Sequence, residues 1–315
     1  MLHGSSLSKE VTSLPETRNM RVFRLWRGIV ANRPSGWNPE LSFVSALILS
    51  MPLIVLLLLL VVFPISQILM LPLEAGGLRQ FANFFQVPAN VRALEYTVLI
   101  SLTVTFGTVI LAAPLAWTLR MPGSTVWKSI VWLAVLAPLW MNIVIKTYAF
   151  MIILGRHGIL SEAAQALRFT SEPVGLLYTP WAVIIAMVHS MLPYGVLPLF
   201  VTFATIESDL VRAAESLGAT RAGAISSVVI PLSLVGILAT GTIVFVICLG
   251  FYVTPVILGG AQTPYISTLV QGDLFLRFDT VGAATDSAVL TAVAGLIVVL
   301  ASWLLGGQSL KRALG

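Results

Sequence analysis

The stretch Leu210-Val-Arg-Ala-Ala-Glu-Ser-Leu-Gly-Ala-Thr220 is a charged insert between two long segments, 173–206 and 222–272, that contain no charged residue. An α-helix crosses the ~30 Å hydrocarbon core of a membrane with about 20 apolar residues, so both neighbouring segments are long enough to span it. The insert therefore lies outside the apolar layer, where another molecule can contact it.

The composition of the whole chain points to the same class of protein. Hydrophobic residues make up 57% of the chain, charged residues make up 10%, and the mean hydropathy is +0.96. This balance is far from that of a soluble domain and predicts an integral membrane protein. Six windows without charged residues have the length of a spanning helix: 41–73, 96–119, 129–145, 173–206, 222–272 and 287–310.

The number of spans depends on the window at 222–272, because this window is long enough to hold two spanning helices. Its continuous apolar part ends near Leu258, after which Gly259-Gly260 and Pro264 interrupt a helix, and 265–272 is too short to cross. Unbroken apolar runs also exclude spanning β-strands, which alternate in polarity. We therefore expect an all-α membrane protein with six spans and both termini on one side. The expected spans are 43–70, 96–119, 129–153, 181–204, 232–258 and 287–306.

The segments outside the spans predict the orientation of the chain. We expect an N-terminal arm at 1–40, a transmembrane domain at 41–310 with a loop at 205–231, and a tail at 311–315. The positive-inside rule places the basic arm, and hence both termini, in the cytoplasm, whereas the later loops divide their basic residues evenly. The basic residues of the arm are Lys9, Arg18, Arg21, Arg24, Arg27 and Arg33.

Part of the arm has helical periodicity. Arg21, Arg24 and Arg27 recur every three residues, with Val22 and Trp26 on the other side of a helix. This pattern predicts an interfacial helix over 20–33 on the anionic cytoplasmic leaflet, and the alternative is a disordered basic arm. The net charge of +5 suits that leaflet, and no nucleic-acid-binding motif is present.

The sequence contains no recognisable enzyme machinery. It has no glycine-rich phosphate loop, no His-Glu-x-x-His motif and no nucleophile-base pair, so we expect no catalytic residue. A single cysteine, Cys248, and three dispersed histidines predict no metal site. Any ATP hydrolysis must therefore take place on another polypeptide.

The insert itself has the pattern of two short helices joined by a turn. Ile206, Leu210, Ala213 and Leu217 recur at intervals of four, three and four, which predicts one apolar stripe on a helix at the membrane surface. Gly218 suits either the left-handed end of that helix or close backbone approach, and Thr220 suits the cap of a second helix. Pro231 is then expected to start the next span. An ordinary amphipathic loop is the alternative interpretation.

The insert resembles the cytoplasmic coupling loop of ABC-importer permeases, in which Glu-Ala-Ala is followed by Gly and later by an apolar-Pro ending. Five residues fit this pattern, namely Ala213, Ala214, Leu217, Gly218 and Pro231, while Arg212 stands where the leading Glu is usual. The resemblance implies that the loop docks on an ATPase subunit, with Glu215 offering a charge to that partner.

Other segments resemble permeases of the spermidine/putrescine type. They are Lys146-Thr-Tyr-Ala-Phe150 with the following Leu-Gly, Leu177-Tyr-Thr-Pro-Trp181, Leu192-Pro-Tyr-Gly-Val-Leu-Pro198 and Phe251-Tyr-Val-Thr-Pro-Val-Ile-Leu-Gly-Gly260. Their order, over roughly 95–305, is more specific than any one of them. Lys146 and Phe150 depart conservatively from the family pattern.

The resemblance implies a transport machine in the bacterial inner membrane. Its expected partners are a second homologous permease, a cytoplasmic ATPase dimer that uses ATP and Mg²⁺, a periplasmic substrate-binding protein and the lipid bilayer. A polyamine would require carboxylates or aromatic faces for its ammonium groups. The aromatic candidates for the substrate pathway are Trp140, Tyr148, Tyr194, Phe251 and Tyr252, each of which also has a packing or interfacial interpretation.

Three other interpretations remain open from the sequence. An ABC permease for a non-polyamine solute has the same features. An ion-coupled secondary transporter usually carries carboxylates near the midplane, whereas here the acidic residues nearest to the spans are Glu95 and Asp286, at their edges. A membrane scaffold without transport activity is the third.

Overall fold

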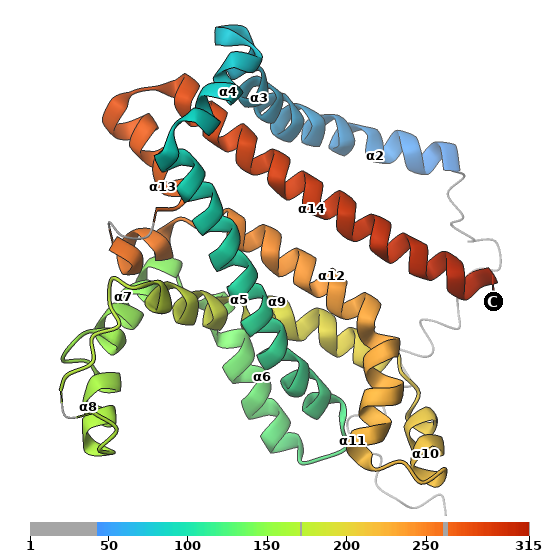
Figure 1. Cartoon of the computed structure of the whole chain (residues 1–315). Helices are drawn as coiled ribbons and strands as arrows, with labels where there is room; N and C mark the ends of the chain where they lie inside the picture. Colours follow the sequence, from blue (N-terminus) through green and yellow to red (C-terminus); the bar gives the residue numbers. More distant parts are fainter. Residues whose placement is uncertain (1–42, 171, 261–263, 315) are drawn as a thin grey trace, which may run out of the picture. The chain divides into compact units, whose positions relative to one another are not determined.

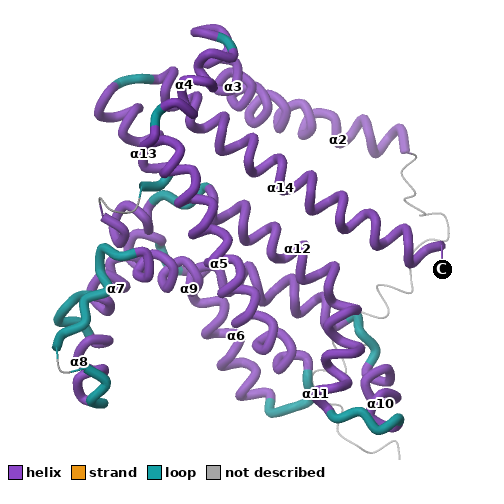
Figure 2. The backbone as a smooth tube through the Cα atoms, viewed as in Figure 1, coloured by secondary structure: helices purple, strands orange, loops and turns teal. Residues whose placement is uncertain are grey.

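A computed structural model describes residues 43–170, 172–260 and 264–314, and every regular element among them is a helix (Figure 1). The backbone coloured by secondary structure shows helices joined by loops that are mostly short (Figure 2). The predicted arm at 1–40 and its interfacial helix at 20–33 lie outside the described residues. The described part of the chain therefore has the all-α architecture expected from its apolar windows.

The chain divides into two compact units, 1–63 and 64–315. In the first, α2 (Phe43–Leu57) passes directly into the π-helical segment η1 (Leu58–Val62). The described side chains from 51 to 62 are all exposed, and most of them are large and apolar. This surface requires lipid or another protein around it, because water does not solvate such an extended apolar face favourably.

The second unit holds the remaining elements. Its regular helices are α3 (Phe63–Gly76), α4 (Leu78–Gln86), α5 (Pro88–Arg120), α6 (Thr125–Trp140), α7 (Ile143–Leu154), α8 (Ile159–Ala166), α9 (Pro180–Ala204), α10 (Ser208–Ser216), α11 (Arg221–Ala224), α12 (Ile230–Leu249), α13 (Ile266–Gly272) and α14 (Thr280–Leu314). Its π-helical segments are η2 (Ile225–Val229), η3 (Pro255–Gly259) and η5 (Asp273–Arg277).

The core of the second unit is built on α5 and α9, and α12 packs against both. The buried face of α5 consists largely of small residues, such as Ala93, Ser101 and Ala112. At Gly195 of α9, an added Cβ would lie 2.9 Å from both the Ala112 Cβ and the Thr108 Cγ2. Small residues therefore allow these two helices to approach closely, which is how helices gain packing energy inside a membrane.

By length and composition, six helical segments of the described chain can cross a membrane: Ile48–Gly76, Pro88–Arg120, Ile143–Ala166, Pro180–Ala204, Arg221–Leu249 and Thr280–Trp303. The shorter helix α6 is apolar as well. Length and composition give the candidates, and the packing of the elements decides which helices run between the two ends of the bundle.

The predicted third span, 129–153, is two helices in the structure. Asn142 interrupts it, because its side chain accepts a hydrogen bond from the Val144 amide at 2.8 Å and caps α7. The loop before α6 lies beside α10, whereas α7 packs against η3 beyond the opposite end of α12 (Figure 1). α6 therefore runs between the two ends of the bundle, and α7 and α8 lie at the end opposite to α10.

The predicted fifth span, 232–258, is also shifted. Its helix begins at Arg221, continues through the π-helical turn η2 and ends at Leu249, so Pro231 lies inside a continuous helix and does not start one. A proline has no amide hydrogen to donate, and its ring clashes with the carbonyl four residues earlier; a wider turn just before it relieves both problems. The second and last spans extend beyond their predicted limits, and α14 continues to Leu314 through the expected tail.

Candidate functional site

The insert at 205–231 is anchored to the C-terminal end of α5. The guanidinium of Arg120, the last residue of α5, donates a hydrogen bond to the carbonyl of Ile206, where the insert begins. The same guanidinium lies 5.0 Å from the centre of the Trp117 ring, and that ring packs edge-on against Phe203 at 5.5 Å. The first residues of the insert are thus held by a cation–π contact and a charge-assisted hydrogen bond.

A glycine ends the first helix of the insert. The amide of Gly218 donates to the Glu215 carbonyl at 3.0 Å, and the amide of Ala219 donates to the Ala214 carbonyl at 3.1 Å. This pair of bonds is the Schellman arrangement, which requires a left-handed residue, and Gly218 has a φ of +92°. An added Cβ at Gly218 would meet no atom within 4 Å, so the position requires glycine for its backbone conformation and not for space within this chain.

The second helix starts as the sequence predicts. The Thr220 hydroxyl accepts a hydrogen bond from the Gly223 amide at 3.1 Å and caps α11. Because α11, η2 and α12 follow one another without a break, the second half of the insert is the first part of a long apolar helix. The turn at Gly218 therefore lies directly before that helix.

The predicted apolar stripe is divided between the core and the surface. Ile206 is buried and Val211 packs beside it, but Leu210 is 44% exposed and Leu217 is 89% exposed. Ala213 is exposed as well. The part of the stripe formed by Leu210, Ala213 and Leu217 therefore points away from the core of this unit.

Charged residues surround this outward stripe. Arg212 lies 3.6 Å from Asp209, and both side chains are largely exposed. A hollow of about 300 Å³ between α10 and the end of α5 is lined by Arg120, Arg212, Glu215 and Arg221 among others. The face presented by the insert is thus an exposed apolar strip with charged borders, which is the composition of a protein-docking surface.

The structure brings together only two of the five aromatic candidates for the pathway. Tyr194 and Phe251 line a cavity of about 200 Å³ between α6, α7, α9 and α12. Trp140 is 88% exposed at the end of α6, and neither Tyr148 nor Tyr252 lines the cavity.

The same cavity is also lined by Lys146, which in the sequence is only a conservative departure from the family motif. Lys146 is 8% exposed, and its Nζ donates to the Pro138 carbonyl at 3.3 Å. In the sequence, Lys146 stands out because it is a charged residue within an apolar segment. It follows the charge-free window 129–145 directly and lies inside the predicted third span, 129–153. A buried ammonium with one neutral acceptor favours an anionic group next to it.

Comparison with known proteins identifies the family to which the chain belongs. No protein-family model matches the chain. It is 30% identical to the spermidine/putrescine transport system permease protein PotB of Escherichia coli over 215 residues, which covers 68% of this chain and 77% of PotB. The chain belongs to the ABC transporter permeases. The permease is also 26% identical to a putative 2-aminoethylphosphonate transport system permease protein, PhnU, of Salmonella paratyphi A, over 77% of this chain and 85% of PhnU.

Solved structures agree on the fold of the permease. A chain of a bacterial alginate ABC transporter, in complex with an alginate-bound periplasmic protein, covers 89% of the permease with a TM-score of 0.66 and 20% identity. That comparison covers 96% of the transporter chain. A chain of the MetNI methionine ABC transporter covers 69% of the permease, and 94% of that chain, with a TM-score of 0.53 and 16% identity. The permease is therefore a multi-pass membrane protein with the ABC-permease fold, and the ion-coupled interpretation is set aside.

Proposed function

We propose that the permease is a membrane subunit of an ATP-driven, binding-protein-dependent importer in the bacterial inner membrane, and that its solute is a polyamine such as spermidine or putrescine. The observation that carries the proposal is the similarity to PotB over 68% of the chain. A second homologous permease completes the pathway, and a periplasmic binding protein delivers the solute.

The insert at 205–231 is the contact for the ATPase. Its exposed strip of Leu210, Ala213 and Leu217 offers apolar area at the point where the turn at Gly218 projects. Glu215 and Arg212 border the strip, so an ATPase groove with an acidic residue near Arg212 is the complementary surface. Closure of the ATPase dimer on ATP and Mg²⁺ then moves α10 and, through the continuous helix from Arg221 to Leu249, the core helices.

This assignment sets the orientation of the chain. With α6 as a crossing and α7 and α8 at one end, the chain crosses six times, so the C-terminus returns to the side of the N-terminus. With the insert in the cytoplasm, the basic arm favours the cytoplasm for both. No nucleotide or metal binds to this chain itself under the proposal. ATP hydrolysis takes place on the partner subunits.

The test is substrate-stimulated ATP hydrolysis in proteoliposomes. The permease is co-expressed with the subunits from neighbouring genes, and its binding protein is loaded with spermidine or putrescine. We expect the loaded binding protein to stimulate ATP hydrolysis by the wild-type complex and not by the Leu217→Asp variant. The variant permease should be expressed at the wild-type level. A permease that purifies without any ATPase would overturn the importer assignment.

One observation favours a second solute class. Lys146 lines the cavity that contains Tyr194 and Phe251, and a buried ammonium there suits an anionic group better than a polycation. The similarity to PhnU makes an aminophosphonate the specific alternative. The same assay with a binding protein loaded with 2-aminoethylphosphonate separates the two solutes, and Lys146→Met is expected to weaken stimulation only by the phosphonate.

A further inference from the structure

A second polar hollow lies at the end of α5 opposite to the insert. Its volume is about 240 Å³, and it lies between α4, the first turn of α5, the η5 segment and the start of α14. α5 has 33 residues, so at 1.5 Å per residue the two ends are about 50 Å apart. With the insert in the cytoplasm, this hollow is on the outer side of the membrane.

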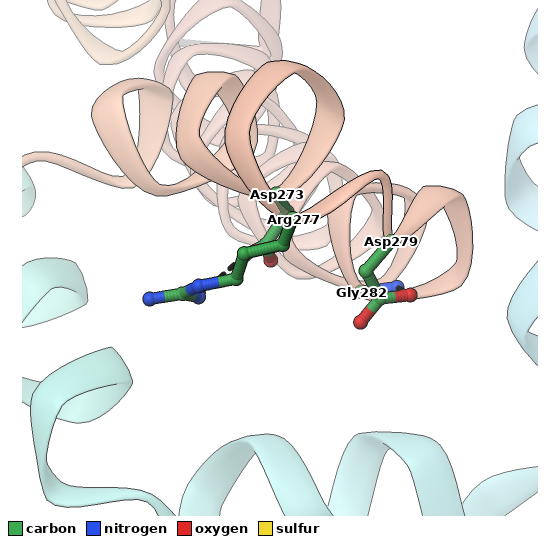
Figure 3. A network of polar contacts seen from close by, with 4 residues as sticks. All are labelled: Asp273, Arg277, Asp279 and Gly282. Carbon is green, nitrogen blue, oxygen red and sulfur yellow. Dashed lines mark hydrogen bonds and ion pairs between the residues drawn. The ribbon is translucent and has the colours of Figure 1, made fainter.

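Two aspartates converge on one wall of the hollow. A Cβ at Gly282 would lie 2.5 Å from one oxygen of Asp279 and 3.0 Å from one oxygen of Asp273, so both carboxylates reach the same point. The other Asp279 oxygen accepts from the Gly282 amide at 2.9 Å, and the other Asp273 oxygen accepts from Arg277 at 2.6 Å (Figure 3). Arg277 therefore neutralises one of these two carboxylates.

A third carboxylate in the hollow has no close partner. Asp286 is 3% exposed and lines the hollow, and among the described residues no hydrogen bond or ion pair reaches its carboxylate, on which the charge of Arg277 acts only from further away. An ionised carboxylate withdrawn from water without a partner is unfavourable, and it is stabilised by a cation at hydrogen-bond distance. Three carboxylates line the hollow, whereas Arg277 is the one cationic side chain among the described residues that line it, so acidic groups exceed basic ones there.

The shape and chemistry of the hollow select the kind of cation. Neutral acceptors complete its wall, with side-chain amides at Asn83 and Asn90 and a hydroxyl at Thr285. Among the described residues, no three acidic, histidine or cysteine side chains are arranged to hold a metal ion. An alkylammonium group has three N–H donors to share between carboxylates and amides, and the volume of the hollow exceeds what a single metal ion fills.

We propose that this hollow is an outer binding site for the ammonium group of an aliphatic amine, with Asp286 as its main anionic contact. The site extends the proposed import function, since an amine-bearing solute arriving from the binding protein meets it before the cavity beside Lys146. Both solutes considered above carry an amine, so the site serves either of them.

The test is a titration of binding in the absence of ATP and of the binding protein. The full-length permease is purified from membranes into lipid nanodiscs with whatever subunits accompany it, and putrescine is titrated by calorimetry. The variants are Asp286→Asn and Asp279→Asn, the second of which keeps a capping side chain at the start of α14. Glu95→Gln is the matched control, because it removes one exposed negative charge from α5 outside the hollow.

The expected result is saturable binding that weakens about tenfold or more in each aspartate variant and stays within about twofold in Glu95→Gln. Calcium chloride is titrated in parallel. Absence of putrescine binding, equal binding in the aspartate variants, or displacement of putrescine by equimolar Ca²⁺ would each overturn the proposal. Because the readout needs no ATPase, the result stands apart from that of the transport assay.

Discussion

Replacement of Gly218 tests whether the turn of the insert acts through its backbone conformation. Gly218 has a φ of +92°, and the space around its missing Cβ is open for 4 Å. Gly218→Ala therefore introduces no clash within this chain, and its cost is the left-handed conformation itself, about 1–2 kcal/mol for a residue with a Cβ. Asparagine tolerates this conformation better than alanine does, so Gly218→Asn is the matched variant.

The strain sets the size of the expected effect on ATPase binding. If the variant relieves its strain by leaving the docking conformation, the competent fraction falls by up to a factor of about 5–30, and the apparent Kd for the ATPase rises by the same factor. The assay is a titration of purified ATPase onto immobilised permease complex, with permease abundance measured in parallel. We expect a clear loss for Gly218→Ala and near wild-type binding for Gly218→Asn.

The pair of variants also identifies the alternative. If Gly218→Asn weakens binding as much as Gly218→Ala does, the backbone argument fails, because conformation alone predicts different outcomes. Steric exclusion by the partner's backbone is then the reason for the glycine. Equal, undiminished binding in both variants would refute either role.

Three further changes give distinct outcomes. Leu217→Ser removes a side chain that is 89% exposed, so the thermal unfolding midpoint of the permease should stay unchanged while ATPase co-purification falls; a lowered midpoint would contradict its outward orientation. Arg120→Gln removes a charged donor from the start of the insert and should destabilise the permease by about 1.5–3 kcal/mol, seen as a lower midpoint. Arg212→Ala, which breaks only an exposed ion pair, serves as its control and should change stability by less than about 1 kcal/mol; similar midpoints for the two would refute the anchoring role. Gly195→Ala places a methyl group 2.9 Å from the Ala112 Cβ, so overpacking should cost about 1–3 kcal/mol in a thermal unfolding assay, and an unchanged midpoint would show that α5 and α9 separate easily.

The spanning helices show what periodicity and composition can predict about helix positions. A run of apolar residues near 181–204 predicts a helix, and α9 occupies Pro180–Ala204. Composition does not fix where a helix breaks when the residue responsible is polar but uncharged. Asn142 lies inside the predicted third span, and its capping bond to Val144 starts α7 where that span divides into α6 and α7.

The sequence likewise predicts some features of the insert and the cavity and not others. The sequence predicts the turn at Gly218 and the cap at Thr220, because both depend on local backbone requirements. The sequence does not predict the direction of the stripe through Leu217, since amphipathic spacing identifies a common face and does not say what that face contacts. The burial of Lys146 beside Tyr194 joins residues from separate helices, which no spacing along the chain reveals.

The sequence by itself determined that the permease is an all-α membrane protein with a charged insert, because transfer of apolar side chains into lipid and the satisfaction of backbone hydrogen bonds depend only on local composition. The tertiary structure alone decided that Asp273, Asp279 and Asp286 share one hollow with Arg277. Their convergence depends on the turn at Phe278 between η5 and α14 and on the packing of α14 beside α4. The four residues are close in sequence, but the opposite wall of the hollow comes from α4 and the start of α5, which are distant along the chain, so local sequence patterns do not predict the hollow.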